Sequence, residues 1–132
     1  MAASLPKHSK RIGLDALLAL GTAKAYLMKT AYVFSAAHKF VSDLGANVLS
    51  AVTLANVTTD QPNEGTLDCD DITWSAISGG FAGFWIGVDT GTGSTSPLIY
   101  YNPDTPVGSL TSPMDVTEHI DAGVNRLFTW GS

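Results

Sequence analysis

The sequence predicts a mainly β protein, an antiparallel β-sandwich or small barrel with one or two short N-terminal helices. From residue 67 to residue 102 the chain reads LDCDDITWSAISGGFAGFWIGVDTGTGSTSPLIYYN. Apolar, β-branched and aromatic runs alternate there with Gly-Gly and with a long stretch of small residues, which is typical of antiparallel strands joined by turns. The chain has 132 residues and thirteen glycines, enough for one domain with its own core and many turns. Sequential hairpins favour this class over an α/β fold.

The start of the chain is expected to be an arm followed by a short helix. Residues 1–11 are predicted to be a flexible basic arm and residues 12–132 a single β-rich domain. Three leucines at helical spacing predict a helix over Lys10–Leu20, which Gly21 ends.

A strand and a second helix are expected next. Apolar side chains on both faces of Lys24–Tyr32 predict a strand that is buried over most of its length. A helix that continues through this segment is the alternative. In Ser35–Leu44, the serine can act as an N-cap and apolar residues follow at helical offsets, so a helix ending at Gly45 is predicted.

The rest of the chain is predicted to be β-structure. Strands are expected at Val48–Thr58, Asp71–Ile77, Phe81–Val88, Leu98–Tyr101 and Asn125–Trp130. Asp60–Gly65 is a cluster of turn residues. Ile72 and Trp74 alternate with polar neighbours and are expected to face inward, whereas Phe81–Val88 is almost continuously apolar, as in a central strand.

Basic residues are concentrated at the start of the chain. Six of the seven Lys and Arg residues fall in the first 39 positions, and eleven acids but only one base, Arg126, follow from Phe40 onward. A basic start on an acidic body indicates an arm that binds nucleic acid or one that docks on an acidic neighbour. So few bases give a weak footprint for nucleic acid, which is therefore not the expected partner. Instead, Lys7, Lys10 and Arg11 are predicted to be assembly contacts with a neighbouring subunit.

The same region imitates a secretory signal, because three bases precede the apolar run IGLDALLALG. Asp15 interrupts that run, so we interpret it as mature sequence. No apolar stretch approaches the 18 or so residues that span a bilayer, and no membrane partner is expected.

Two acidic motifs could carry chemistry, but each is better explained as a turn. Asp70-Asp71 lacks the loop pattern of a calcium site. Asp89-Thr90-Gly91 is similar to the aspartic-protease signature, in which two carboxylates share a proton. A chain this small would have to dimerise to form that pair, so a hairpin turn is favoured.

The remaining candidate residues also have structural explanations. Cys69 is the only cysteine, which excludes an internal disulfide and a thiolate metal site and predicts a small buried side chain. The three histidines are too scattered to form a metal-ligand set. The tryptophans could stack on carbohydrate, but two of them lie in the most strand-like runs, where core packing is expected. These tryptophans are Trp74, Trp85 and Trp130, and the histidines are His8, His38 and His119. No catalytic, metal-binding or cofactor-binding residue is predicted.

Several segments together carry a family resemblance. They are Gly13–Leu18, Lys24–Met28, Tyr32–Phe34, His38–Leu44, Asp70–Trp74, Asp89–Gly93, Ser96–Tyr101 and Arg126–Trp130. In these segments the chain resembles a family of small virion proteins of tailed bacteriophages, and the resemblance covers residues 12–132. The chain departs from the family pattern at Gly79–Gly83, where relatives carry more polar residues.

The resemblance implies a structural component of the virion rather than an enzyme. A decoration or accessory protein on the outside of the head is expected, with other virion proteins as partners, the major capsid protein foremost, and with self-association into a homo-oligomer. A minor tail or head-fibre protein is the nearest alternative. An alternative of another class is a small carbohydrate-binding or aspartyl hydrolase-like module, with a tryptophan platform or Asp89 as its site.

Overall fold

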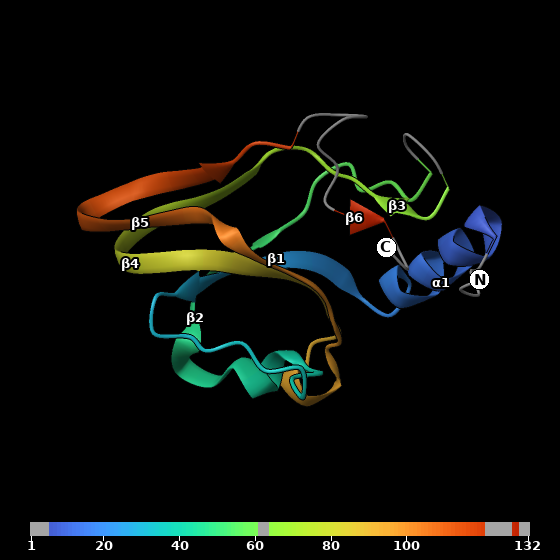
Figure 1. Ribbon diagram of the computed structural model, residues 1–132, viewed down its shortest axis with the longest axis horizontal. Coiled ribbons are helices and arrows are strands. Elements are labelled where there is room, and N and C mark those ends of the chain that lie inside the picture. Colours follow the sequence, from blue (N-terminus) through green and yellow to red (C-terminus); the bar gives the residue numbers. More distant parts are fainter. Residues whose placement is uncertain (1–5, 61–63, 121–127, 130–132) are drawn as a thin grey trace, which may run out of the picture.

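In the computed structural model, which describes residues 6–60, 64–120 and 128–129, the chain is mainly β. The elements are α1 (Lys7–Leu18), β1 (Thr22–Lys29), the 3-10 helix η1 (Val41–Asn47), β2 (Val48–Thr53), β3 (Thr66–Leu67), β4 (Ile72–Asp89), the 3-10 helix η2 (Gly93–Thr95), β5 (Leu98–Glu118) and β6 (Phe128–Thr129). An antiparallel four-stranded sheet has the order β2-β1-β4-β5, and β3 pairs with β6 (Figure 1). The mainly β, antiparallel class with short N-terminal helices is confirmed.

The long hairpin of β4 and β5 bends back over the sheet. The ring centroids of Trp74 and Phe84 in β4 lie 5.7 Å apart, although ten residues of flat strand would separate them by about 33 Å. The bend coincides with register shifts against β5 and with positive φ at Gly79 and Gly83. The prediction of two strands with a turn at Gly-Gly is therefore wrong, because one strand crosses these glycines and bends at them (Figure 1).

Strand β5 is much longer than the predicted Leu98–Tyr101 and continues to Glu118. Pro103, Pro106 and Pro113 lie within it, and prolines count against a strand when only the sequence is considered. They are tolerated because β5 is an edge strand, with β4 on one side only.

The main core lies between the bent hairpin and one face of the sheet. Its buried residues are Leu14, Ala25, Leu27, Leu54, Leu67, Cys69, Ile72, Trp74, Ile77, Phe81, Phe84, Ile86 and Val116. The Trp74 indole N–H donates a hydrogen bond to the Ala25 carbonyl at 3.0 Å and so joins β4 to β1. The predicted inward positions of Ile72 and Trp74 are confirmed, as is the burial of Cys69.

A second, smaller core covers the opposite face of the sheet. Tyr26, Met28, Leu44 and Trp85 form it, and the segment 30–47, which includes η1, lies over them. Both faces of β1 and β4 are thus covered near their centres. This explains why Ala25–Met28 of β1 and Phe81–Val88 of β4 lack a polar face in the sequence.

Both predicted helices occur, with shifted boundaries. Helix α1 begins at Lys7 rather than Lys10, so residues 7–11 of the predicted flexible arm are helical. The second helix is the 3-10 helix η1, which begins at Val41, so the predicted bounds Ser35–Leu44 are wrong. The Asp43 carboxylate accepts the backbone N–H groups of Lys39 at 2.8 Å and Phe40 at 2.9 Å, which places the helix start at Phe40. Of the predicted strand Asn125–Trp130, only Phe128–Thr129 is described, as β6; the other residues lie outside the described part of the chain.

Candidate functional site

A hollow of about 490 Å³ lies beside the edge strand β5. It is lined by aromatic, aliphatic and proline side chains: Phe34, Trp85, Ile99, Tyr100, Tyr101 and Pro103. This set, called the aromatic hollow below, brings together β4, β5 and the segment that precedes η1. Its volume is in the range of small binding sites. None of the six lining residues is charged, so the hollow suits binding rather than acid–base chemistry.

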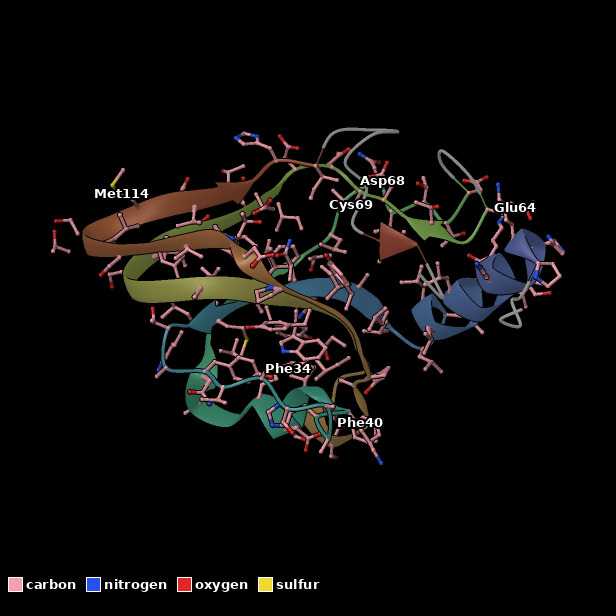
Figure 2. The ribbon with its side chains drawn as sticks, viewed as in Figure 1. Phe34, Phe40, Glu64, Asp68, Cys69 and Met114 are labelled. Atoms are coloured by element: carbon pink, nitrogen blue, oxygen red, sulfur yellow. The ribbon has the colours of Figure 1, made fainter. Side chains whose placement is uncertain are left out.

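The rings of the aromatic hollow stack on one another. Phe34 is almost parallel to Tyr101, with an interplanar angle of 2° and centroids 5.3 Å apart. Trp85 stacks on Tyr101 at 5.0 Å and on Phe34 at 6.0 Å. Such contacts add to the stabilisation from burial alone. Figure 2 shows Phe34 projecting from the segment below the sheet toward the strands.

A hydrogen-bond chain holds the floor of the hollow in place. The Trp85 indole N–H donates to the Tyr32 hydroxyl at 3.1 Å, and that hydroxyl lies 2.7 Å from Nδ1 of His38. Burial raises the pKa of Tyr32, and the hydrogen bond from Trp85 opposes that shift. Burial likewise raises the pKa of Tyr101. Both phenols therefore stay neutral at physiological pH and act as hydrogen-bonding and stacking groups.

Sequence reasoning did not find this hollow. It assigned Trp85 to the core, where the side chain is indeed 6% exposed, but it did not bring Phe34 to it. The available signal was the apolar run Tyr32–Phe34, which lies immediately before the predicted helix Ser35–Leu44. The register between β4 and β5 shifts at Ile86 and Gly87, and this bulge interrupts the simple alternation of side chains at Ile99 and Tyr100. The bulge has no visible sequence signature.

The predicted assembly contacts lie together on α1, but one of them is already engaged. Arg11 lies 3.6 Å from Asp15, 3.6 Å from Asp60 and 3.7 Å from Glu64. Glu64 also lies 3.1 Å from His8 (Figure 2). Within the described residues no ion pair involves Lys7 or Lys10, so these two lysines keep their charge available to a partner.

Asp89 lies in an ion pair at the end of β4. Its carboxylate is 2.7 Å from Nζ of Lys24 and accepts the Gly91 N–H at 2.8 Å. The hydrogen bond from Lys24, followed by that from Gly91, lowers the pKa of Asp89. A carboxyl that shares a proton in a catalytic pair needs the opposite shift in one partner. The interpretation of Asp89-Thr90-Gly91 as a hairpin turn is confirmed, because Asp89 ends β4 and Thr90 and Gly91 begin the connection to the antiparallel strand β5.

The other acidic motif is also used structurally. Asp71 lies 2.9 Å from Nδ1 of His119 and accepts the Ile120 N–H at 2.7 Å, which fastens the end of β5 to the start of β4. The hydrogen bond from His119 lowers the pKa of Asp71, and the Ile120 N–H lowers it further. Across residues 6–60, 64–120 and 128–129, no three His, Cys, Asp or Glu residues are grouped to hold a metal ion.

The two tryptophans that the structure describes do not offer open platforms. Trp74 is completely buried and Trp85 is 6% exposed, so neither presents a ring face to a sugar. Trp130 lies outside the described residues. The expected core role of the first two is confirmed.

Comparison with known protein families, with curated proteins and with solved structures finds no match for this chain. The resemblance to phage virion proteins therefore stays a prediction. None of the helices in the described part of the chain is long and apolar enough to cross a membrane.

Proposed function

We propose that this chain is a structural component of a tailed-phage virion, a decoration or accessory protein on the outside of the head. The observation that carries the proposal is an exposed apolar surface on a weakly charged protein. Phe34, which lines the aromatic hollow, is 51% exposed, and the preceding residue, Val33, is 79% exposed. Apolar side chains gathered in this way on a surface mark contacts with another macromolecule.

The arrangement of the acidic residues supports a scaffold rather than an enzyme. Asp71 and Asp89 are held at turns by cations and backbone N–H groups. Each has a lowered pKa, which keeps it ionised rather than ready to donate a proton. A general acid at neutral pH needs a raised pKa.

In this proposal the partners are other virion proteins, the major capsid protein foremost, together with further copies of the same chain. The aromatic hollow supplies the apolar contact. Lys7 and Lys10 on the first turns of α1 supply a second contact, with an acidic surface of a neighbour. A lysine pair on a short helix positions such a contact more precisely than a flexible arm would.

The test is the protein composition of purified particles of the phage that encodes this chain. The proposal predicts that quantitative mass spectrometry finds the chain in intact particles at many copies, in a fixed ratio to the major capsid protein. Empty heads without tails are predicted to retain it. Retention on tails alone would favour the minor tail or fibre alternative, and absence from both would refute the proposal.

A further inference from the structure

His38 ends a chain of hydrogen bonds that begins inside the molecule at Trp85. The Trp85 indole nitrogen lies 3.1 Å from the Tyr32 hydroxyl oxygen, and that oxygen lies 2.7 Å from Nδ1 of His38. We propose that His38 is a pH-sensitive switch, in which proton uptake at Nδ1 reverses the bond to Tyr32 and weakens the bond that holds Trp85 in the aromatic hollow. This switch is a property of the folded chain and does not depend on a place in a virion.

The chemistry of the three groups sets the direction of both bonds. An indole N–H only donates, so the Tyr32 oxygen accepts from Trp85. The Tyr32 hydroxyl has no other hydrogen-bond partner among the described residues, so its own hydrogen is used only if it points at His38. The distance of 2.7 Å agrees, because it is typical of an O–H donor and short for an N–H donor. Neutral His38 is therefore the tautomer that carries its hydrogen on Nε2, and Nδ1 accepts.

Proton uptake removes the acceptor at the end of this chain. With a hydrogen on Nδ1, the Tyr32 hydroxyl turns its own hydrogen away, and its oxygen accepts from His38 as well as from Trp85. Hydrogen bonds in a chain polarise and strengthen one another, and this cooperativity is lost when the central group no longer passes a donor onward. The charged imidazole is also the stronger of the two donors that share the oxygen. The bond from Trp85 to Tyr32 is weakened as a result.

The aromatic hollow is coupled to this bond through ring contacts. Trp85 stacks on Tyr101 at 5.0 Å and on Phe34 at 6.0 Å, and Tyr32 meets Tyr101 edge-on with centroids 5.6 Å apart. The His38 ring itself lies 5.6 Å from the Tyr32 ring. The charge of His38 therefore acts on the innermost wall of the hollow, and the hollow is held most firmly when His38 is neutral.

The phenols around His38 do not titrate with it. Histidine is the side chain whose charge changes between about pH 5 and 8. Burial raises the pKa of Tyr32, of Tyr26 in β1 and of Tyr101 in β5, so all three phenols stay neutral over this range. Strand β4 contributes Trp85, whose indole does not titrate.

Two charged residues lie beside His38, one in its own segment and one in η1. The pKa of Asp43 is lowered by the backbone N–H groups of Lys39 and Phe40 and, to a smaller extent, by the charge of His38. Asp43 is thus ionised between about pH 5 and 8, and a lysine is positive over the same range. Neither neighbour changes its charge while His38 does, so a change at Trp85 in this range reports on His38.

The experiment is NMR spectroscopy of the isotope-labelled full chain between about pH 8 and 5. The ring nitrogen shifts are predicted to identify His38 as the Nε2–H tautomer at the upper end of the range. As His38 takes up its proton, the indole N–H resonance of Trp85 is predicted to move upfield with the same midpoint. Trp74 is the internal reference, because its indole N–H donates to the Ala25 carbonyl, and its resonance is predicted not to follow that midpoint.

Three variants assign the movement. His38→Gln offers an amide oxygen to Tyr32 but takes up no proton, so it is predicted to abolish the movement of the Trp85 resonance. Tyr32→Phe keeps the ring and removes the hydroxyl, so His38 is predicted to titrate while Trp85 no longer follows it. His119→Gln is the matched control, because His119 pairs with Asp71 at 2.9 Å beyond the opposite end of β5. It is predicted to leave the movement unchanged.

A Trp85 resonance that stays fixed in the wild type overturns the inference, and so does a movement that persists in His38→Gln. Loss of the movement in His119→Gln overturns it as well, because the change would then not originate at His38. An Nδ1–H tautomer of His38 at about pH 8 also refutes it, and this measurement is made where the chain is folded.

Discussion

Trp74 is the side chain that connects the two layers of the fold. It is completely buried, contacts Phe84 of the same strand and donates a hydrogen bond to Ala25 of β1. We predict that Trp74→Ala lowers the free energy of unfolding by about 3–5 kcal/mol, the cost of removing a large buried ring. Urea denaturation followed by far-UV circular dichroism measures this loss.

The control for this prediction is the next residue along the strand, Ser75, whose side chain is exposed. Ser75→Ala is expected to change the free energy of unfolding by less than about 0.5 kcal/mol. Similar effects of the two substitutions would mean that the hairpin does not bend back over β1 as described.

The Asp89–Lys24 pair predicts a pH dependence of stability. The folded-state pKa of Asp89 is lowered, so the pair stabilises the protein above the unfolded-state pKa of about 3.9 and loses this contribution as pH falls through the lower folded value. Asp89→Asn is therefore predicted to flatten the fall in melting temperature below about pH 4.

Lys24→Met is the companion variant, because the lysine is the largest cause of the lowered pKa of Asp89. It is predicted to flatten the same acid limb, though less, since the Gly91 N–H remains. Wild-type behaviour of both variants below pH 4 would contradict the role given to this pair.

At the scale of elements, the bend of β4 depends on its glycines. Gly79 and Gly83 both have positive φ, but a Cβ at Gly79 would enter open space, whereas one at Gly83 would collide with the Asn102 carbonyl oxygen. Gly79→Ala is predicted to cost about 1–2 kcal/mol of the free energy of unfolding, from backbone strain alone. Gly83→Ala adds a steric cost and is predicted to reach roughly 2–5 kcal/mol.

Chemical denaturation of the two variants side by side makes this comparison. The two positions are four residues apart in one strand and introduce the same methyl group. Equal losses, or a larger loss at Gly79, would show that β5 does not pass close to Gly83.

Helix α1 gives a prediction that differs from that of a flexible arm. Residues 7–11 are its first turns, and Arg11 joins them to Asp60 and Glu64. Deletion of residues 1–11 is predicted to lower the melting temperature by at least about 5 °C, because the remaining turns are too short to hold a helix by themselves. Differential scanning calorimetry measures this change. An unchanged melting temperature would mean that residues 1–11 are a free arm that contributes nothing to stability.

The sequence predicted those elements whose signals are local. The burial of Ile72 and Trp74 followed from the alternation of apolar and polar residues. It missed features that depend on distant contacts. Gly79-Gly80 has the composition of a turn, yet pairing with β5 keeps it within a strand. Ser35 has the composition of a helix cap, yet Asp43 caps the chain at Phe40.

At the scale of the whole molecule, the two faces of the sheet are covered differently. The bent hairpin and α1 close one face over the larger core, whereas the segment 30–47 closes the other over a smaller one. That second cover leaves Val33 exposed, and also Phe34, which lines the aromatic hollow. The aromatic hollow could not be inferred from the sequence, because it forms only where β4, β5 and this segment meet.

We propose, as the central point, that this fold is a building unit of a phage particle. The most direct measurement is a cryo-electron microscopy reconstruction of intact particles of the phage that encodes the chain, at a resolution that traces strands. We predict density for the bent β4–β5 hairpin and α1 on the outer surface of the head, with the aromatic hollow buried against a neighbouring chain. Particles with no such density on head or tail would contradict the account.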